Sequence, residues 1–195
     1  MKLTVAQAVS TTVVIALVAI AGYWGWTRYS KVCCSEIEQN NGPVVSAYLF
    51  DECALSNPVM ESYPRQCTMS DGRIFIEDIG NELSQIDNIV VESPRPNTVV
   101  ISPLTVEGKA RGTWFFEGSF PITLLDWNGF VIAQGVATAK GDWMTEEFVP
   151  FTSTLEFDGV EGVERASIML QKDNPSGLPE QDDLLEIPVL FDTSE

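Results

Sequence analysis

The sequence contains no histidine, and this absence excludes several kinds of chemistry. Ser-His-Asp triads and Cys-His pairs use an imidazole as their general base, and histidine is also the commonest protein ligand of metals. Basic residues are scarce as well, because 11 Lys and Arg oppose 28 Asp and Glu, which gives a formal net charge of −17. Phosphate groups are bound by clustered cationic side chains, so this charge excludes nucleic acid as a partner. No pattern in the chain predicts a cofactor.

Charge is absent altogether from one long stretch near the amino terminus. Residues 3–27 carry no charged side chain, and as a helix they would extend about 37 Å, more than the roughly 30 Å apolar thickness of a bilayer. Aromatic rings and cations gather at the end of the stretch, as a membrane interface favours: Tyr23, Trp24, Trp26, Arg28, Tyr29 and Lys31. We therefore predict a transmembrane anchor over residues 1–31. The alternative is a signal peptide cleaved after residues 19–21.

The cysteines and the charge of the remaining chain indicate where it resides. All four cysteines lie beyond the apolar stretch, within 35 residues of one another: Cys33, Cys34, Cys53 and Cys67. Such a density of cysteine suits an oxidising space outside the cytoplasm. From residue 32 onward the chain holds 8 basic and 28 acidic residues, hence a net charge of −20, which favours a soluble surface. We expect a single-pass protein of the bacterial cytoplasmic membrane with its carboxyl-terminal part outside, or a secreted protein if the anchor is cleaved.

Residues 32–80 form a short segment in which the cysteines predict disulfide bonds. Cys53 and Cys67 enclose 13 residues, and closing a loop of that size stabilises the fold by about 3 kcal/mol, through lost chain entropy in the unfolded state. A bond between adjacent Cys33 and Cys34 has poor geometry, so these two could pair with the other two or with another chain. Three pairings stay open. A zinc site would need Cys-x-x-Cys spacing, which is absent.

Residues 86–195 show the pattern of an all-β domain. Residues 104–110 alternate apolar or small side chains with polar ones, the period of a half-buried strand. Asn128-Gly129 stands between two apolar runs and predicts a hairpin with a type I′ turn, and Asp71-Gly72 predicts another hairpin in the preceding segment. About seven strands in roughly 110 residues predict a β-sandwich. We expect helix only as a turn or two near residues 79–86.

Certain residues of this domain form a specific series. The series is Ile89-x-Val91-x-Ser93-Pro94-x-Pro96-Asn97-x-Val99, then Ser102-Pro103-Leu104-x-Val106-x-Gly108-x-Ala110-x-Gly112-x-Trp114-x-Phe116-Glu117, and later Gly141-x-Trp143-Met144. Over residues of about 88–192 the chain resembles the immunoglobulin-like domain of bacterial spore-germination proteins. The resemblance implies an exported, immunoglobulin-like β-sandwich without established catalytic residues. It does not imply a role in germination, because the usual companion germination domain has no counterpart in this sequence.

Two tryptophans are the candidate ligand contacts, because sugar rings stack on exposed indole faces. Trp127 falls in the predicted hairpin turn, where it is either a contact residue or a cover for a neighbouring strand. Trp143 is the second candidate, although a core position is the more ordinary place for it, as it is for Trp114. The acidic loop 173–183 has oxygen ligands to offer calcium, but its spacing is not that of an EF-hand. We expect a solvated loop and no metal site. We expect any partner to be contacted at the loop regions around Trp127 and 173–183, because sandwich loops cluster at the ends of the fold.

Paired carboxylates raise the question of catalysis. Glu146-Glu147 and Asp182-Asp183 would have to place two carboxyl groups about 5–10 Å apart across a cleft to hydrolyse a glycan. Adjacent acids on turns are usually solvated, so we expect no enzyme. We expect instead a membrane-anchored binding or scaffolding protein of the cell envelope, whose partner is an envelope protein or a wall glycan. The alternatives are a wall-glycan hydrolase and a structural spacer linked through Cys33 or Cys34.

Overall fold

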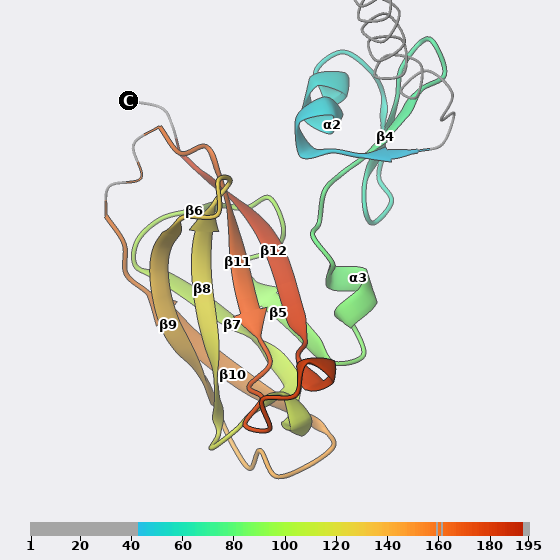
Figure 1. The fold of residues 1–195 in the computed structure, drawn as a ribbon. Helices are drawn as coiled ribbons and strands as arrows, with labels where there is room; N and C mark the ends of the chain where they lie inside the picture. The colour runs from blue at the N-terminus through green and yellow to red at the C-terminus, as the bar shows by residue number, and fades with distance from the viewer. Residues whose placement is uncertain (1–42, 159, 161, 193–195) are drawn as a thin grey trace, which may run out of the picture.

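The computed structural model describes residues 43–192 apart from residues 159 and 161, and it contains two β-sheets (Figure 1). The predicted anchor over residues 1–31, together with Cys33 and Cys34, lies outside the described residues. In the described part of the chain, no helix combines the length and the apolar character needed to cross a bilayer. We refer to residues 43–80 as the N-terminal module, to residues 81–88 as the linker and to residues 89–192 as the sandwich.

The N-terminal module is a small four-stranded sheet with one helix against it. Its strands, in sheet order, are β1 (Val44–Val45), β4 (Ile74–Ile76), β3 (Gln66–Thr68) and β2 (Val59–Met60). Helix α2 (Ala47–Ala54) contradicts the expectation that helix is confined to residues 79–86. Ser46 caps α2 by accepting a hydrogen bond from the Leu49 backbone N–H, and Phe50 and Cys53 lie three residues apart on its buried face.

A disulfide joins this helix to the small sheet. The structure pairs Cys53 with Cys67, one of the pairings that the sequence left open. Both cysteines are buried, and with Phe50 and Phe75 they form the buried cluster between helix and sheet. The partly buried side chains of Ala54, Val59 and Met69 pack against this cluster. Half of the buried residues in the cluster therefore belong to the disulfide.

Two hairpins share one turn geometry, which differs from the predicted one. In the first, the Met69 N–H donates to the Arg73 carbonyl and the Gly72 N–H donates to the Met69 carbonyl; Asp126, Gly129 and Phe130 repeat this pattern in the second. Each loop holds its glycine at a positive φ, 88° at Gly72 and 83° at Gly129, whereas Asn128 does not adopt one. The hairpin at Asn128-Gly129 is present, but the type I′ turn is wrong. The Asp126 carboxylate accepts hydrogen bonds from the N–H groups of Asn128 and Phe130. These bonds stabilise a loop of three residues, one more than the predicted type I′ turn has.

The sandwich is an eight-stranded sheet folded over on itself. Its strands are β5 (Ile89–Ser93), β6 (Val99–Val100), β7 (Leu104–Arg111), β8 (Ser119–Asp126), β9 (Val131–Ala139), β10 (Phe148–Leu155), β11 (Arg165–Gln171) and β12 (Leu184–Phe191). Their order is β5-β7-β10-β9-β8-β11-β12-β6, and β9 meets β10 at only two residue pairs. Strands β5, β7 and β10 thus form one layer, and the others form the second (Figure 1). The eight strands agree with the expected all-β fold of about seven strands.

Alternating residues of both layers fill the core. On β7 the inward residues Leu104, Val106, Gly108 and Ala110 are buried while those between them are exposed, as predicted. Trp114, at the end of a short 3₁₀ turn (η1, Gly112–Trp114), is buried and packs edge-on against Phe120, so its expected core position is confirmed. The ring of Phe120 in turn meets Phe151 of the opposite layer, with 5.0 Å between the ring centroids.

A network of charged groups joins the module to the sandwich. Its first part centres on Glu82, which opens helix α3 (Glu82–Gln85) and is only 4% exposed. The Glu82 carboxylate accepts hydrogen bonds from the Arg95 guanidinium and from the Tyr63 hydroxyl. Arg95, which lies between β5 and β6, also donates to the Val91 carbonyl at 2.7 Å and to the Tyr63 hydroxyl at 2.7 Å. One residue of the sandwich therefore contacts both the linker and the module. The turn of helix expected near residues 79–86 is therefore present, and it lies at the junction.

The second part of the network centres on Glu77, which is 7% exposed. Its carboxylate accepts two hydrogen bonds from the Arg65 side chain, at 3.0 and 2.7 Å, and one from the Asn97 amide at 3.1 Å. Burial by itself raises the pKa of a carboxyl group, but these hydrogen bonds outweigh burial and hold the pKa of Glu77 below its usual value. Glu77 thus stays ionised and links β3–β4 to the start of β6.

Candidate functional site

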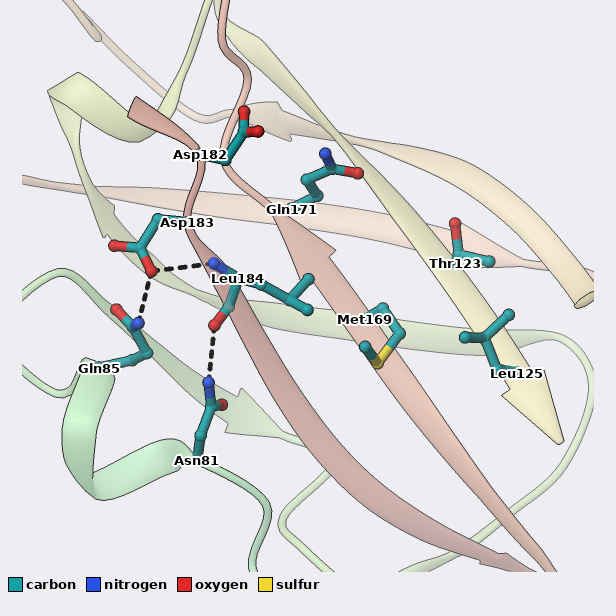
Figure 2. A pocket seen from close by; sticks show the side chains of 9 residues that line it. All are labelled: Asn81, Gln85, Thr123, Leu125, Met169, Gln171, Asp182, Asp183 and Leu184. Atoms are coloured by element: carbon teal, nitrogen blue, oxygen red, sulfur yellow. Dashed lines mark hydrogen bonds between the residues drawn. The ribbon is translucent and has the colours of Figure 1, made fainter. Parts of the chain in front are cut away.

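A groove lies on the outer face of the second layer, beside α3 (Figure 2). Strand alternation creates its floor, because the side chains next to buried core positions point outward. Thr123 and Leu125 come from β8, Met169 and Gln171 from β11, and Leu184 begins β12. The strand register sets Met169 opposite Thr123 and Gln171 opposite Leu184. The cavity volume is about 600 Å³.

One wall of the groove is the linker and helix α3. The Asn81 amide donates to the Leu184 carbonyl at 2.7 Å, and its oxygen accepts from the Glu186 N–H at 2.7 Å. Asn81 therefore pairs with the β12 backbone much as a neighbouring strand would. One turn later, the Gln85 amide donates to Asp183 Oδ1 at 2.5 Å. These bonds fix the wall against the start of β12 (Figure 2).

The end of the groove is formed by the β11–β12 loop, which includes a short 3₁₀ turn, η2 (Pro179–Gln181). Asp183 Oδ1 accepts from the Leu184 N–H at 2.9 Å as well as from Gln85. The neighbouring Asp182 accepts through Oδ1 from the Asn174 amide at 2.8 Å. Both carboxylates are therefore positioned by neighbouring amide donors, and each keeps its second oxygen, Oδ2, without a hydrogen bond from the described residues.

The groove combines an aliphatic floor with uncharged and acidic polar groups. Leu125, Met169 and Leu184 supply the aliphatic part. The Thr123 hydroxyl and the Gln171 amide form no hydrogen bond with the described part of the chain, so they are available to a ligand. The lining contains two carboxylates but neither a cation nor an aromatic ring. Among residues 43–192, apart from residues 159 and 161, no group of three His, Cys, Asp or Glu side chains is arranged to hold a metal ion.

The structure brings only part of the predicted contact surface to the groove. Of the loop 173–183, Asp182 and Asp183 line it, whereas Trp127 and Trp143 do not. Sequence reasoning missed the residues contributed by the linker and by the outward face of the sheet: Asn81, Gln85, Thr123, Leu125, Met169, Gln171 and Leu184. The alternation that points the strand side chains outward can be recognised in the sequence. The packing of α3 against β12 cannot, because it produces no local sequence pattern.

The two candidate tryptophans occupy different environments. Trp127 is 74% exposed at the tip of the β8–β9 hairpin, whereas Trp143 is half-buried and packs against the core and over Gly118. Replacing Trp127 with alanine is therefore expected to change the free energy of unfolding by less than about 0.5 kcal/mol. The matched change Trp143→Ala should cost about 2 kcal/mol, because it removes packed apolar area. Urea unfolding of both variants checks this, and a large loss in Trp127→Ala would show that its indole is structural.

Comparison with known protein families gives one match. Residues 88–177 match the immunoglobulin-like domain of bacterial spore germination, which confirms the resemblance seen in the sequence. The matched range begins just before β5 and ends inside the β11–β12 loop, so β12 lies beyond it. No curated protein matches the chain, and no solved structure does.

Proposed function

We propose that this protein is a membrane-anchored binding or scaffolding protein of the bacterial cell envelope and that it is not an enzyme. Residues 3–27 would hold it in the cytoplasmic membrane, with the module and the sandwich outside. The apolar stretch, the acidic charge beyond it and the disulfide support this location. The partner is an envelope protein or a wall glycan.

The groove is the observation that carries the proposal. Its floor lies outside the sandwich core, so the aliphatic side chains there are not needed to hold the two layers together. Its wall and its end are fixed by hydrogen bonds, while Thr123 and Gln171 keep free polar groups. A preformed hollow with free polar groups is the ordinary form of a binding site.

Co-sedimentation of the full chain, kept in mild detergent, with an isolated envelope fraction tests this function. We expect saturable binding. Filling the groove with Met169→Trp should weaken it by about tenfold or more, equivalent to ~1.4 kcal/mol. Met144→Trp is the matched control, because Met144 is 77% exposed and lies outside the groove. Absence of saturable binding, or equal weakening by the two variants, would contradict the proposal.

A further inference from the structure

We infer that the groove binds a cationic side chain, that of a lysine or an arginine, presented by an extended peptide segment. The inference rests on the proposed binding function and names the ligand class for the same site. It favours an envelope protein over a wall glycan as the partner.

The charge of the groove is the first argument. Asp182 and Asp183 both line it, and each uses only Oδ1 within the protein. The cations of the junction, Arg65 and Arg95, are committed to Glu77 and Glu82 and do not line the groove. The two carboxylates therefore lack a counter-ion among the residues that line the groove, and a ligand that supplies one gains charge-assisted hydrogen bonds.

The floor is the second argument. Lysine and arginine bury their methylene stems along apolar surface while the charged head contacts polar groups. Leu184 offers such a surface beside Asp183, and Met169 and Leu125 continue it across β11 and β8 (Figure 2). A cationic side chain can therefore extend across the sheet with its stem on the floor and its head at the β11–β12 loop.

The remaining polar groups suit a peptide backbone. The volume of about 600 Å³ exceeds that of one side chain, so neighbouring residues of the ligand also fit. The Thr123 hydroxyl can donate and accept, and the Gln171 amide does both, which matches the N–H and C=O groups of an extended chain. A sugar would gain most from an aromatic face, and the lining has none.

Methyl NMR of the full chain in detergent micelles, with ¹³C-labelled methionine methyl groups, tests the inference directly. Met169 reports on the groove, while Met60 and Met144, which are 62% and 77% exposed, report on other surfaces. The probe is the peptide acetyl-Ala-Lys-Ala-amide, and the control carries an acetylated ε-amine. We expect the lysyl peptide to shift the Met169 signal saturably and the acetylated peptide to bind at least about fivefold more weakly.

Charge-neutralising variants locate the contact. Asp182→Asn with Asp183→Asn keeps both Oδ1 acceptors but removes the charge, and it should weaken lysyl-peptide binding about fivefold. Glu92→Gln with Glu156→Gln, two exposed acids outside the groove, is the matched control and should change it little. Equal binding of both peptides, no shift at Met169, or equal weakening by both variant pairs would overturn the inference. If envelope binding nevertheless falls in Met169→Trp, the proposed function stands and only the ligand class is wrong.

Discussion

Replacing Arg95 with methionine is expected to lower the free energy of unfolding by about 3 kcal/mol. The change leaves the Glu82 carboxylate almost fully buried without its cation, and among the described residues only the Tyr63 hydroxyl still donates to it. The Tyr63 hydroxyl has no positively charged form, and burial and the hydrogen bond to Glu82 raise its pKa, so it stays a neutral donor. Methionine retains most of the apolar stem, so the loss reports the charge and the hydrogen bonds of the guanidinium, including the one to the Val91 carbonyl. Urea unfolding monitored by tryptophan fluorescence measures it.

A second arginine provides the control for this experiment. Arg73 pairs with Asp71 at 2.8 Å, but both side chains are more than half exposed. Because exposed ion pairs contribute little, Arg73→Met should change the free energy of unfolding by less than about 0.5 kcal/mol. Removing both partners of the junction pair, in Arg95→Met with Glu82→Leu, should recover much of the loss, since no charge stays buried. If Arg95→Met lowers the free energy of unfolding no more than Arg73→Met does, the Arg95–Glu82 pair does not hold the N-terminal module against the sandwich.

The junction also bears on the groove, because the two share one short segment. Glu82 follows Asn81, the residue that pairs with β12, and Gln85 lies one helical turn further on. Any movement of Glu82 on loss of its cation will therefore move the groove wall. For this reason we expect Arg95→Met to weaken lysyl-peptide binding as well, although Arg95 does not line the groove.

The strands of the sandwich could be predicted because their signal is local. Burial alternates residue by residue along β7 and β12, and the sequence carries the same period. Helix α2 was missed because it has only eight residues, of which two, Phe50 and Cys53, are buried in the core of the module. From the sequence, Cys53 was interpreted only as one end of a disulfide loop. The turn type was missed because the loop between Asp126 and Phe130 has three residues instead of the two of a type I′ turn, and the Asp126 carboxylate stabilises this longer loop by accepting from Asn128 and Phe130.

The groove and the junction could not be predicted, because their contacts are distant in sequence. Asn81 meets Leu184 across 103 residues, and Glu77 meets Asn97 across 20. Outward residues such as Met169 follow a pattern that predicts only solvent exposure, and Glu77 and Glu82 are ordinary acids in an acidic chain. Glu77 and Glu82 are buried because Arg65 and Arg95 lie next to them in the folded molecule. A periodic pattern in the sequence cannot predict that proximity. The location of the protein stays a prediction from residues 3–27 and the cysteines.

Replacing Cys53 and Cys67 with alanine is expected to unfold the N-terminal module and to leave the sandwich folded. These two cysteines are half of the buried cluster in the described part of the module, so Phe50 and Phe75 would keep only the partly buried side chains around them: Ala54, Val59 and Met69. The bond closes a loop of 13 residues, and its loss costs about 3 kcal/mol. Amide hydrogen exchange should therefore show about a hundredfold loss of protection in α2 and β3. Small domains with so little core rarely stay folded without such a staple.

The sandwich has its own core of 24 buried apolar residues and needs no disulfide for it, so its β7 and β11 amides should keep their protection in the same variant. Cys33→Ala with Cys34→Ala is the matched control, because the Cys53–Cys67 bond survives it, and protection in α2 should be unchanged. A parallel loss in β7 and β11 would contradict this expectation. It would mean that the Glu77 and Glu82 contacts bind the two sheets into one cooperative unit, so that the module could not unfold without the groove-bearing face.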